Sequence, residues 1–130
     1  MSFLLDTNVM IGVMRNNPAI RRKLRFTPVD QVATSSIVMH ELYYGAYKGT
    51  ETASDLGILA ALPVNVLDFT IDDSLRAGEI RAYLQARGTP IGPYDVLIAG
   101  QALARDLTLV TRNTREFSRV DGLRVENWEA

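Results

Sequence analysis

Residues 3–8 read Phe3-Leu4-Leu5-Asp6-Thr7-Asn8, an apolar run that stops abruptly at an acid. A short apolar run without alternating polar positions is typical of a strand buried in a parallel sheet. Further runs of this kind occupy residues 32–34, 64–67, 107–110 and 123–125. These runs predict a central, mostly parallel sheet of about five strands.

Longer segments with helical periodicity fill the intervals between the strands: residues 9–15, 18–25, 37–48, 52–62, 71–87 and 94–105. Thr70 and Asp73 have the spacing of a capping box, and Gly88 is placed to end the helix that they start. Strands separated by helices imply right-handed crossovers, so we expect one α/β domain over residues 1–130, a three-layer sandwich with helices on both faces. The helical pair that turns at residues 48–50 is expected to project as an arm or clip.

Composition excludes several classes of function. With 14 Lys and Arg against 15 Asp and Glu, the net charge is -1, so any contact with nucleic acid must use a local patch. There is no cysteine and only one histidine, His40, which excludes a disulfide framework, a thiolate nucleophile and a Cys- or His-based zinc cluster. Neither a signal peptide nor a membrane span is evident, and we expect a cytoplasmic protein.

Polar residues follow two of the predicted strands. Asp6 comes directly after the first strand, while Thr111, Asn113 and then Glu116 follow the fourth. Because ligands bind at the carboxyl ends of the strands in open α/β sheets, we expect these residues to lie at one edge.

Two further acids, Glu41 and Asp95, lie on helices among apolar neighbours. Each acid has an ordinary structural alternative: Asp6 as a helix N-cap, Asp95 as a first-turn acid and Glu41 as a solvated residue. Converging carboxylates would repel by about 3 kcal/mol per pair at ~5 Å and an effective dielectric of 20. Oxygen ligands without His or Cys select Mg²⁺ or Mn²⁺, which supports phosphoryl transfer by holding the phosphate and activating a water.

Four pieces of the chain together resemble a PIN domain, and in particular the VapC ribonuclease toxins of bacterial toxin-antitoxin pairs. The pieces, in order, are Leu5-Asp6-Thr7-Asn8, Glu41-Leu42-Tyr43-Tyr44-Gly45-Ala46, Gly92-Pro93-Tyr94-Asp95 with Ile98-Ala99-Gly100, and Val110-Thr111-Arg112-Asn113-Thr114-Arg115-Glu116-Phe117. The resemblance covers nearly the whole chain.

The resemblance implies roles for these residues. Asp6, Glu41 and Asp95 would bind the metal, while Thr7, Asn8 and Thr111 would hold metal waters or the acids themselves. Many PIN domains have an acid where this chain has Asn113. Either Glu116 supplies the fourth carboxylate or a second metal binds weakly, which leaves one or two ions open.

The resemblance also implies an activity and partners. It implies a metal-dependent RNA endonuclease that forms a homodimer and is inhibited by a VapB-like antitoxin through an inserted peptide with a basic residue. Several relatives of this kind cut the anticodon loop of initiator tRNA, so tRNA is the expected substrate.

Other notable side chains have structural explanations beside functional ones. The basic run Arg21, Arg22, Lys23 and Arg25 is interpreted as a solvated face, whereas Arg112, Arg115 and Arg119 would position RNA phosphates near the acids. His40 is assigned to the surface or to packing rather than to base catalysis. Three tyrosines and three leucines are assigned to core or dimer packing, although the tyrosines could stack bases: Tyr43, Tyr44, Tyr47, Leu56, Leu59 and Leu62.

Two other functions compete with a nuclease. One is an aspartyl-phosphate enzyme, either a haloacid-dehalogenase-like phosphatase or a response-regulator receiver. It is disfavoured because the only lysines are Lys23 and Lys48 and because Asn8 stands where a second acid is often found. The other is a non-catalytic PIN-like module that binds protein or RNA, in which the acids serve only as caps.

Overall fold

The computed structural model describes residues 2–129, which form five strands and seven α-helices. The strands are β1 (Phe3–Leu5), β2 (Val32–Ser35), β3 (Asn65–Leu67), β4 (Thr108–Val110) and β5 (Val125–Glu126). The helices are α1 (Thr7–Met14), α2 (Pro18–Arg25), α3 (Ser36–Lys48), α4 (Thr52–Ala61), α5 (Ile71–Ala86), α6 (Pro93–Ala104) and α7 (Thr114–Phe117), with a 3-10 turn η1 (Val29–Gln31).

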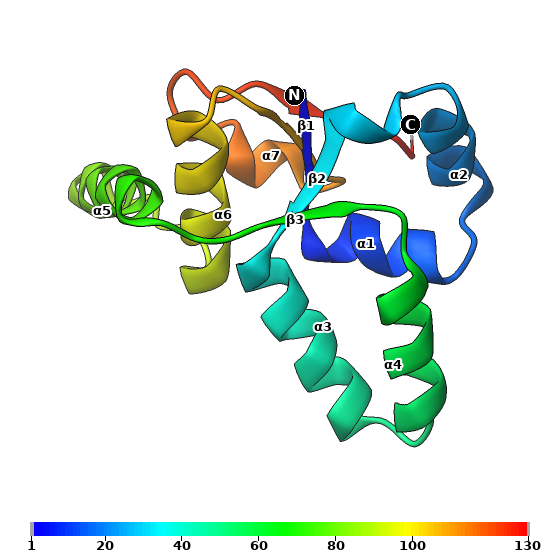
Figure 1. The fold of residues 1–130 in the computed structure, drawn as a ribbon. Coiled ribbons are helices and arrows are strands. Elements are labelled where there is room, and N and C mark those ends of the chain that lie inside the picture. Colours follow the sequence, from blue (N-terminus) through cyan, green and yellow to red (C-terminus); the bar gives the residue numbers. More distant parts are fainter. Residues whose placement is uncertain (1, 130) are drawn as a thin grey trace.

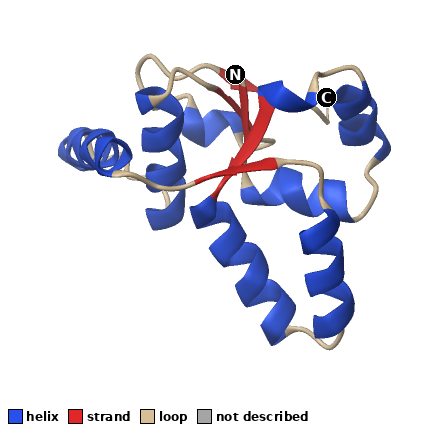
Figure 2. Ribbon diagram, viewed as in Figure 1, coloured by secondary structure: helices blue, strands red, loops and turns tan. Residues whose placement is uncertain are grey.

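The strands form one sheet in the order β3-β2-β1-β4-β5, and every neighbouring pair is parallel. Helices α5, α6 and α7 lie on one side of the strands and α1 and α2 on the other (Figure 1). Figure 2 shows the strands enclosed between these helical layers. The predicted three-layer α/β sandwich is therefore confirmed.

Burial follows from a strand's place in the sheet. Leu4, Leu5 and Leu109 in the central strands are fully buried, because helices cover both faces. The sequence predicts the same for residues 64–67, but Val66 is largely exposed because β3 is an edge strand. An apolar run alone does not distinguish an edge strand from a central one.

Short elements account for the other differences from the sequence prediction. Helix α1 begins at Thr7 rather than at residue 9, because Asp6 caps it. The single-turn elements η1 and α7 were not predicted, since they are too short to show a helical period. The capping box of Thr70 and Asp73 is present, and Gly88, with φ of 70°, follows the end of α5.

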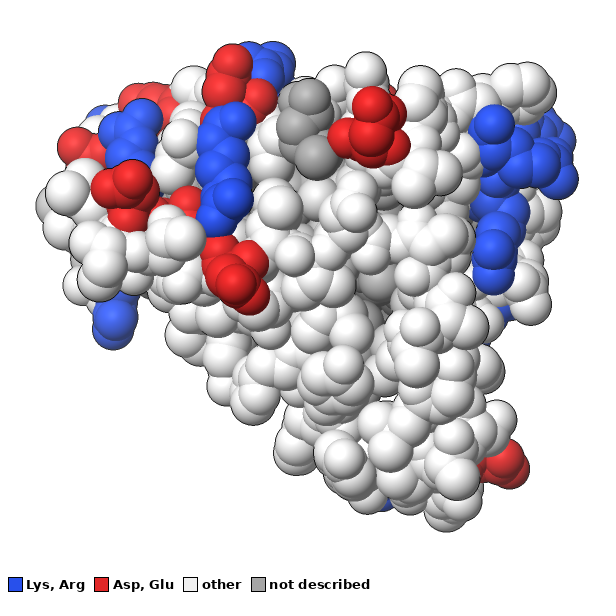
Figure 3. Space-filling view, viewed as in Figure 1, with Lys and Arg blue, Asp and Glu red and all other residues white. Residues whose placement is uncertain are grey.

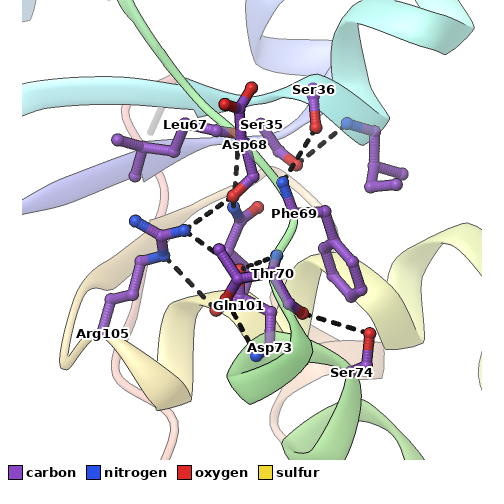
Figure 4. A network of polar contacts seen from close by, with 11 residues as sticks. Ser35, Ser36, Leu67, Asp68, Phe69, Thr70, Asp73, Ser74, Gln101 and Arg105 are labelled. Atoms are coloured by element: carbon purple, nitrogen blue, oxygen red, sulfur yellow. Dashed lines mark hydrogen bonds and ion pairs between the residues drawn. The ribbon is translucent and has the colours of Figure 1, made fainter.

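A polar network ties the β3–α5 connection to α3 and α6 (Figure 4). Arg105 on α6 pairs with Asp73 on α5 at 3.1 Å and donates to the Asp68 carbonyl at 2.7 Å. Gln101 donates to the same carbonyl at 3.2 Å, and Ser36 accepts from the Phe69 N–H at 3.1 Å. These contacts hold α6, and therefore its first turn, in a fixed position against the sheet.

The α3–α4 hairpin projects away from the sheet, as the sequence predicts for residues 37–62 (Figure 1). Within residues 2–129, none of the helices combines the length and apolarity that crossing a membrane requires.

Candidate active site

Asp6 lies at the carboxyl end of β1 and is only 4% exposed. Its carboxyl accepts from the Val9 N–H at 2.9 Å and from the side chain of Thr111, which follows the neighbouring strand β4. Burial raises the pKa of Asp6 above its ordinary value, although these hydrogen bonds and the nearby Arg112 oppose the shift. Asp6 is therefore an N-cap, as the structural alternative proposed, and it also belongs to an acidic cluster.

Glu41 lies on α3, the helix that follows β2. The Thr7 hydroxyl donates to Glu41 Oε1 at 2.8 Å and so joins the first residue of α1 to the middle of α3. Thr7 thus holds an acid directly, which is one of the two roles that the resemblance implies. Asn8 is exposed on the next position of α1.

Asp95 lies in the first turn of α6 and is partly buried. Burial is the largest cause that raises the pKa of Asp95 to about 6. The other causes are the negative charges of Glu116, Asp6 and Glu41. A Cβ added at Gly92 would lie 3.0 Å from Asp95 Oδ2, so the glycine allows the chain to pass close to this carboxyl.

The segment after β4 adds a hydroxyl, an amide and a carboxylate. Thr111 is fully buried and its hydroxyl accepts from the Asn113 N–H at 3.0 Å. The Asn113 side chain donates to Glu116 on α7. Asn113 therefore positions the acid at the place where the chain departs from the simplest family pattern.

The fold brings the four acids within electrostatic range of one another at the carboxyl edge of the sheet. As their side chains stand, however, no three His, Asp or Glu residues among residues 2–129 are close enough to form a ready metal-binding group. Each carboxyl except that of Asp95 is instead held by a hydroxyl, an amide or a backbone N–H: Asp6, Glu41 and Glu116. The oxygen-only donors suit a hard divalent cation, and the raised pKa of Asp95 indicates negative charge that such a cation would offset.

A cleft of about 220 Å³ reaches Glu41 between α1, α3 and α4. Apolar side chains line it, including Ile11, Leu42 and Ile58, together with a second acid, Asp55, and a cation, Arg15. Sequence reasoning missed Asp55, and its helical spacing gives no signal that it faces Glu41 across a cleft.

The remaining side chains have mixed outcomes. His40 is exposed, as expected, and its ring centroid lies 5.7 Å from that of Tyr94. Leu59 is buried, which confirms its core assignment. Core packing is wrong for Tyr43, Tyr44 and Tyr47, which are exposed, so dimer packing stays a prediction for them.

Arg112 lies close enough to lower the pKa of Asp6, and Arg119 donates to the Pro90 carbonyl at 3.2 Å.

Comparison with known proteins gives consistent matches. Residues 3–123 match the model of the PIN domain family. The chain is 40% identical to the tRNA(fMet)-specific endonuclease VapC of Shigella flexneri, over 98% of both chains. It is 35% identical to Ribonuclease VapC2 of Rickettsia felis, over 99% of both chains. A crystal structure of DNA-bound VapBC from Salmonella typhimurium superposes with a TM-score of 0.94 at 40% identity, over 98% of both chains.

Proposed function

The chain belongs to the PIN domain family, and from this premise we propose that it is a metal-dependent endoribonuclease toxin of the VapC type. The observation that carries the proposal is the cluster of acids around Asp95: burial, and then the negative charges of Glu116, Asp6 and Glu41, raise the pKa of that carboxyl. Such a cluster is costly unless a cation or a proton balances it. The family match also favours a nuclease over the aspartyl-phosphate alternative.

We assign metal binding to Asp6, Glu41, Asp95 and Glu116, with Mg²⁺ or Mn²⁺ as the ion. When bound, such an ion would stabilise charge on the phosphate and promote attack by water. Thr7 and Asn113 would keep Glu41 and Glu116 oriented, while Thr111 would do so for Asp6. Arg112 would attract the RNA backbone without reading its sequence.

The substrate proposed is tRNA, and specifically the anticodon loop of initiator tRNA. This proposal rests on the 40% identity to a relative named for tRNA(fMet). A single-stranded loop also suits a site that contacts phosphates and leaves selectivity to shape.

The test is gel-resolved cleavage of total cellular tRNA by the purified protein, with Mg²⁺ or Mn²⁺, with EDTA, and beside Asp95→Asn. We expect discrete fragments that require both the metal and Asp95. If the folded, antitoxin-free protein yields no fragments from tRNA, the tRNA proposal is wrong and ribosomal RNA is the next substrate to test.

Titration calorimetry with Mn²⁺ tests the metal separately from cleavage. We expect a saturable heat that disappears in Asp95→Asn. The absence of saturable heat would instead favour the non-catalytic binding module.

We propose that a VapB-like antitoxin inhibits the enzyme by inserting a peptide into the cleft beside Glu41. The structural neighbours include VapBC complexes. Two acids, Glu41 and Asp55, outnumber the one cation of the cleft, Arg15, so the apolar walls and net negative charge suit a segment that carries apolar side chains and one basic residue. An Ile58→Arg substitution, at an exposed side chain of the same cleft, should weaken inhibition by the antitoxin, and unchanged inhibition would refute this placement.

A further inference from the structure

Helix α2 carries a dense local positive charge in a chain of net charge -1. Its residues include Arg21, Arg22, Lys23 and Arg25 and no acid. Figure 3 shows a blue patch over α2, whereas blue and red atoms are interspersed over α5 and α6 on the other side of the view. The patch is thus a local field that composition alone does not reveal.

One of the four cations serves the fold. Arg21 Nη2 donates to the Val13 carbonyl at 2.9 Å, in the last turn of α1. Ile20 is fully buried on the inner face of α2, and Leu24 packs against the core one turn later. These three residues dock α2 and leave its outer face to Arg22, Lys23 and Arg25.

Within residues 2–129, the outer cations take part in no ion pair. Arg22, Lys23 and Arg25 are exposed, and the ion pairs found within residues 2–129 are Arg76–Glu79, Arg105–Asp73 and Arg124–Asp106. Their charges are therefore available to an external anion.

The three cations lie near the C-terminal end of α2, but stabilisation of that helix end explains their presence only in part. Cations near a helix C-terminus are favourable, because the terminal carbonyls lack helical partners. Here, however, the Lys23 carbonyl accepts from the Phe26 N–H at 3.2 Å and from the Thr27 hydroxyl at 2.7 Å, and the Leu24 carbonyl accepts from the Thr27 N–H at 3.2 Å. These carbonyls are already satisfied without the three cations.

An exposed aromatic ring adjoins the cations. Phe26, directly after α2, is 82% exposed, and a groove lined by Arg25, Thr27 and Val29 lies beside this end of the helix. Single-stranded nucleic acids bind where cations contact the phosphates and an aromatic ring stacks on a base.

We infer that Arg22, Lys23, Arg25 and Phe26, here called the α2 basic patch, form a second contact for single-stranded RNA, apart from the cleavage site. The inference rests on the proposed ribonuclease function and extends it to a longer stretch of substrate. Helix α1 separates Asp6 from α2 and is about 12 Å long at ~1.5 Å per residue. The patch would therefore hold nucleotides some distance from the cleaved phosphate and help to select the RNA by its shape.

Binding of a fluorescein-labelled single-stranded RNA, measured by anisotropy in EDTA, tests the patch without cleavage. The patch variant is Arg22→Gln, Lys23→Gln and Arg25→Gln, and the matched control, Lys48→Gln, Arg81→Gln and Arg87→Gln, loses the same charge at exposed residues elsewhere. We expect the patch variant to bind at least about tenfold more weakly and to show a salt dependence smaller by about 2 in log–log slope, since each phosphate contact contributes ~0.7. We expect Phe26→Ala to lose about fivefold or more in affinity with an unchanged salt slope.

Equal losses in the two triple variants would overturn the inference, because they would reflect net charge alone. Unchanged RNA affinity in the patch variant would overturn it too and would assign the cations to another partner, such as an acidic protein. Circular dichroism must first show that each variant is folded.

Cleavage with Mg²⁺, measured in parallel, separates this inference from the proposed function. A parent that binds RNA through the patch but never cleaves would refute only the nuclease. A parent that cleaves and is indifferent to the patch substitutions would refute only the patch.

Discussion

Asp95 shows how one carboxyl sets function against stability. The pKa of Asp95 is raised to about 6 in the folded protein, whereas this carboxyl ionises near 3.8 in the unfolded chain. Folding therefore favours the uncharged form of Asp95 relative to the unfolded chain. The charged carboxylate therefore destabilises the metal-free fold fully above pH 6, and this penalty disappears as the pH falls to 3.8.

We accordingly expect Asp95→Asn to stabilise the protein in EDTA at neutral pH while it abolishes cleavage. After allowance for solvent screening, the gain should be about 1 kcal/mol at pH 7, and it should vanish below pH ~4. Urea unfolding at several pH values measures the gain. A variant less stable than the parent at pH 7 would show that burial and the neighbouring acids do not destabilise the carboxylate.

Thr7 allows a test of orientation rather than charge. Its hydroxyl donates to Glu41 Oε1 at 2.8 Å. Thr7→Val keeps the shape but removes this donor, and we expect cleavage to fall about tenfold with little loss of stability. Thr7→Ser, which retains the hydroxyl, should cleave nearly as the parent does. Equal rates for both variants would refute the positioning role.

At the residue scale, the sequence predicts where the acids lie and, through the family resemblance, that Thr7 and Thr111 hold acids or metal waters, but it does not predict what holds Glu116. Asp6 and Thr111 follow neighbouring parallel strands, so their proximity is implied by the topology. The bond from Asn113 to Glu116 depends on the single turn of α7, which has too few residues to leave a periodic signal. The catalytic and metal-binding roles stay predictions until the substitutions are made.

At the scale of elements, the contact between α5 and α6 fixes the first turn of α6, where Asp95 lies. A Cβ at Gly100 would come within 2.6 Å of the backbone of Ala77, so the two helices pack at a distance that only glycine permits. We expect Gly100→Ala to cost about 1–3 kcal/mol. Gly78→Ala on α5, where nothing lies within 4 Å, should instead stabilise by up to about 1 kcal/mol. Thermal unfolding compares them, and equal melting temperatures would contradict the close packing.

Asp73 stabilises the same pair of helices through charge. It is 1% exposed, and burial alone would raise its pKa, but hydrogen bonds and the ion pair with Arg105 lower it below 3.8 overall. The resulting stabilisation is complete above that pH and is lost as the pH falls through the lowered folded value. We expect Asp73→Asn to cost about 2 kcal/mol at pH 7 and progressively less as the pH falls below 3.8. A difference that does not depend on pH would exclude the charge as the cause.

The elements were predicted better than their environments. Long helices such as α5 carry both a period and a capping box, so the sequence fixes their type and start. The edge position of β3 depends on which strands pair, and nothing within residues 64–67 encodes that choice. The predicted burial of this strand was wrong for this reason.

At the scale of the whole molecule, homodimerisation is the remaining expectation. Tyr43, Tyr44 and Tyr47 on α3 are exposed and, with Val66 of β3, line a largely apolar hollow. Apolar surface of this kind on an edge of a sheet is commonly covered by a partner. Helical spacing suggested burial for the tyrosines, and a second copy of the chain would supply it.

Placing charge in this hollow should therefore separate the copies. We expect the parent to be dimeric in light scattering coupled to gel filtration, and Tyr43→Arg with Tyr47→Arg to be monomeric, because an unpaired buried cation costs several kcal/mol at an interface. Val29→Arg, at an exposed apolar residue of η1 outside the hollow, is the matched control and should remain dimeric. A dimer that survives the double substitution would place the interface elsewhere and leave the tyrosines free to stack on RNA bases.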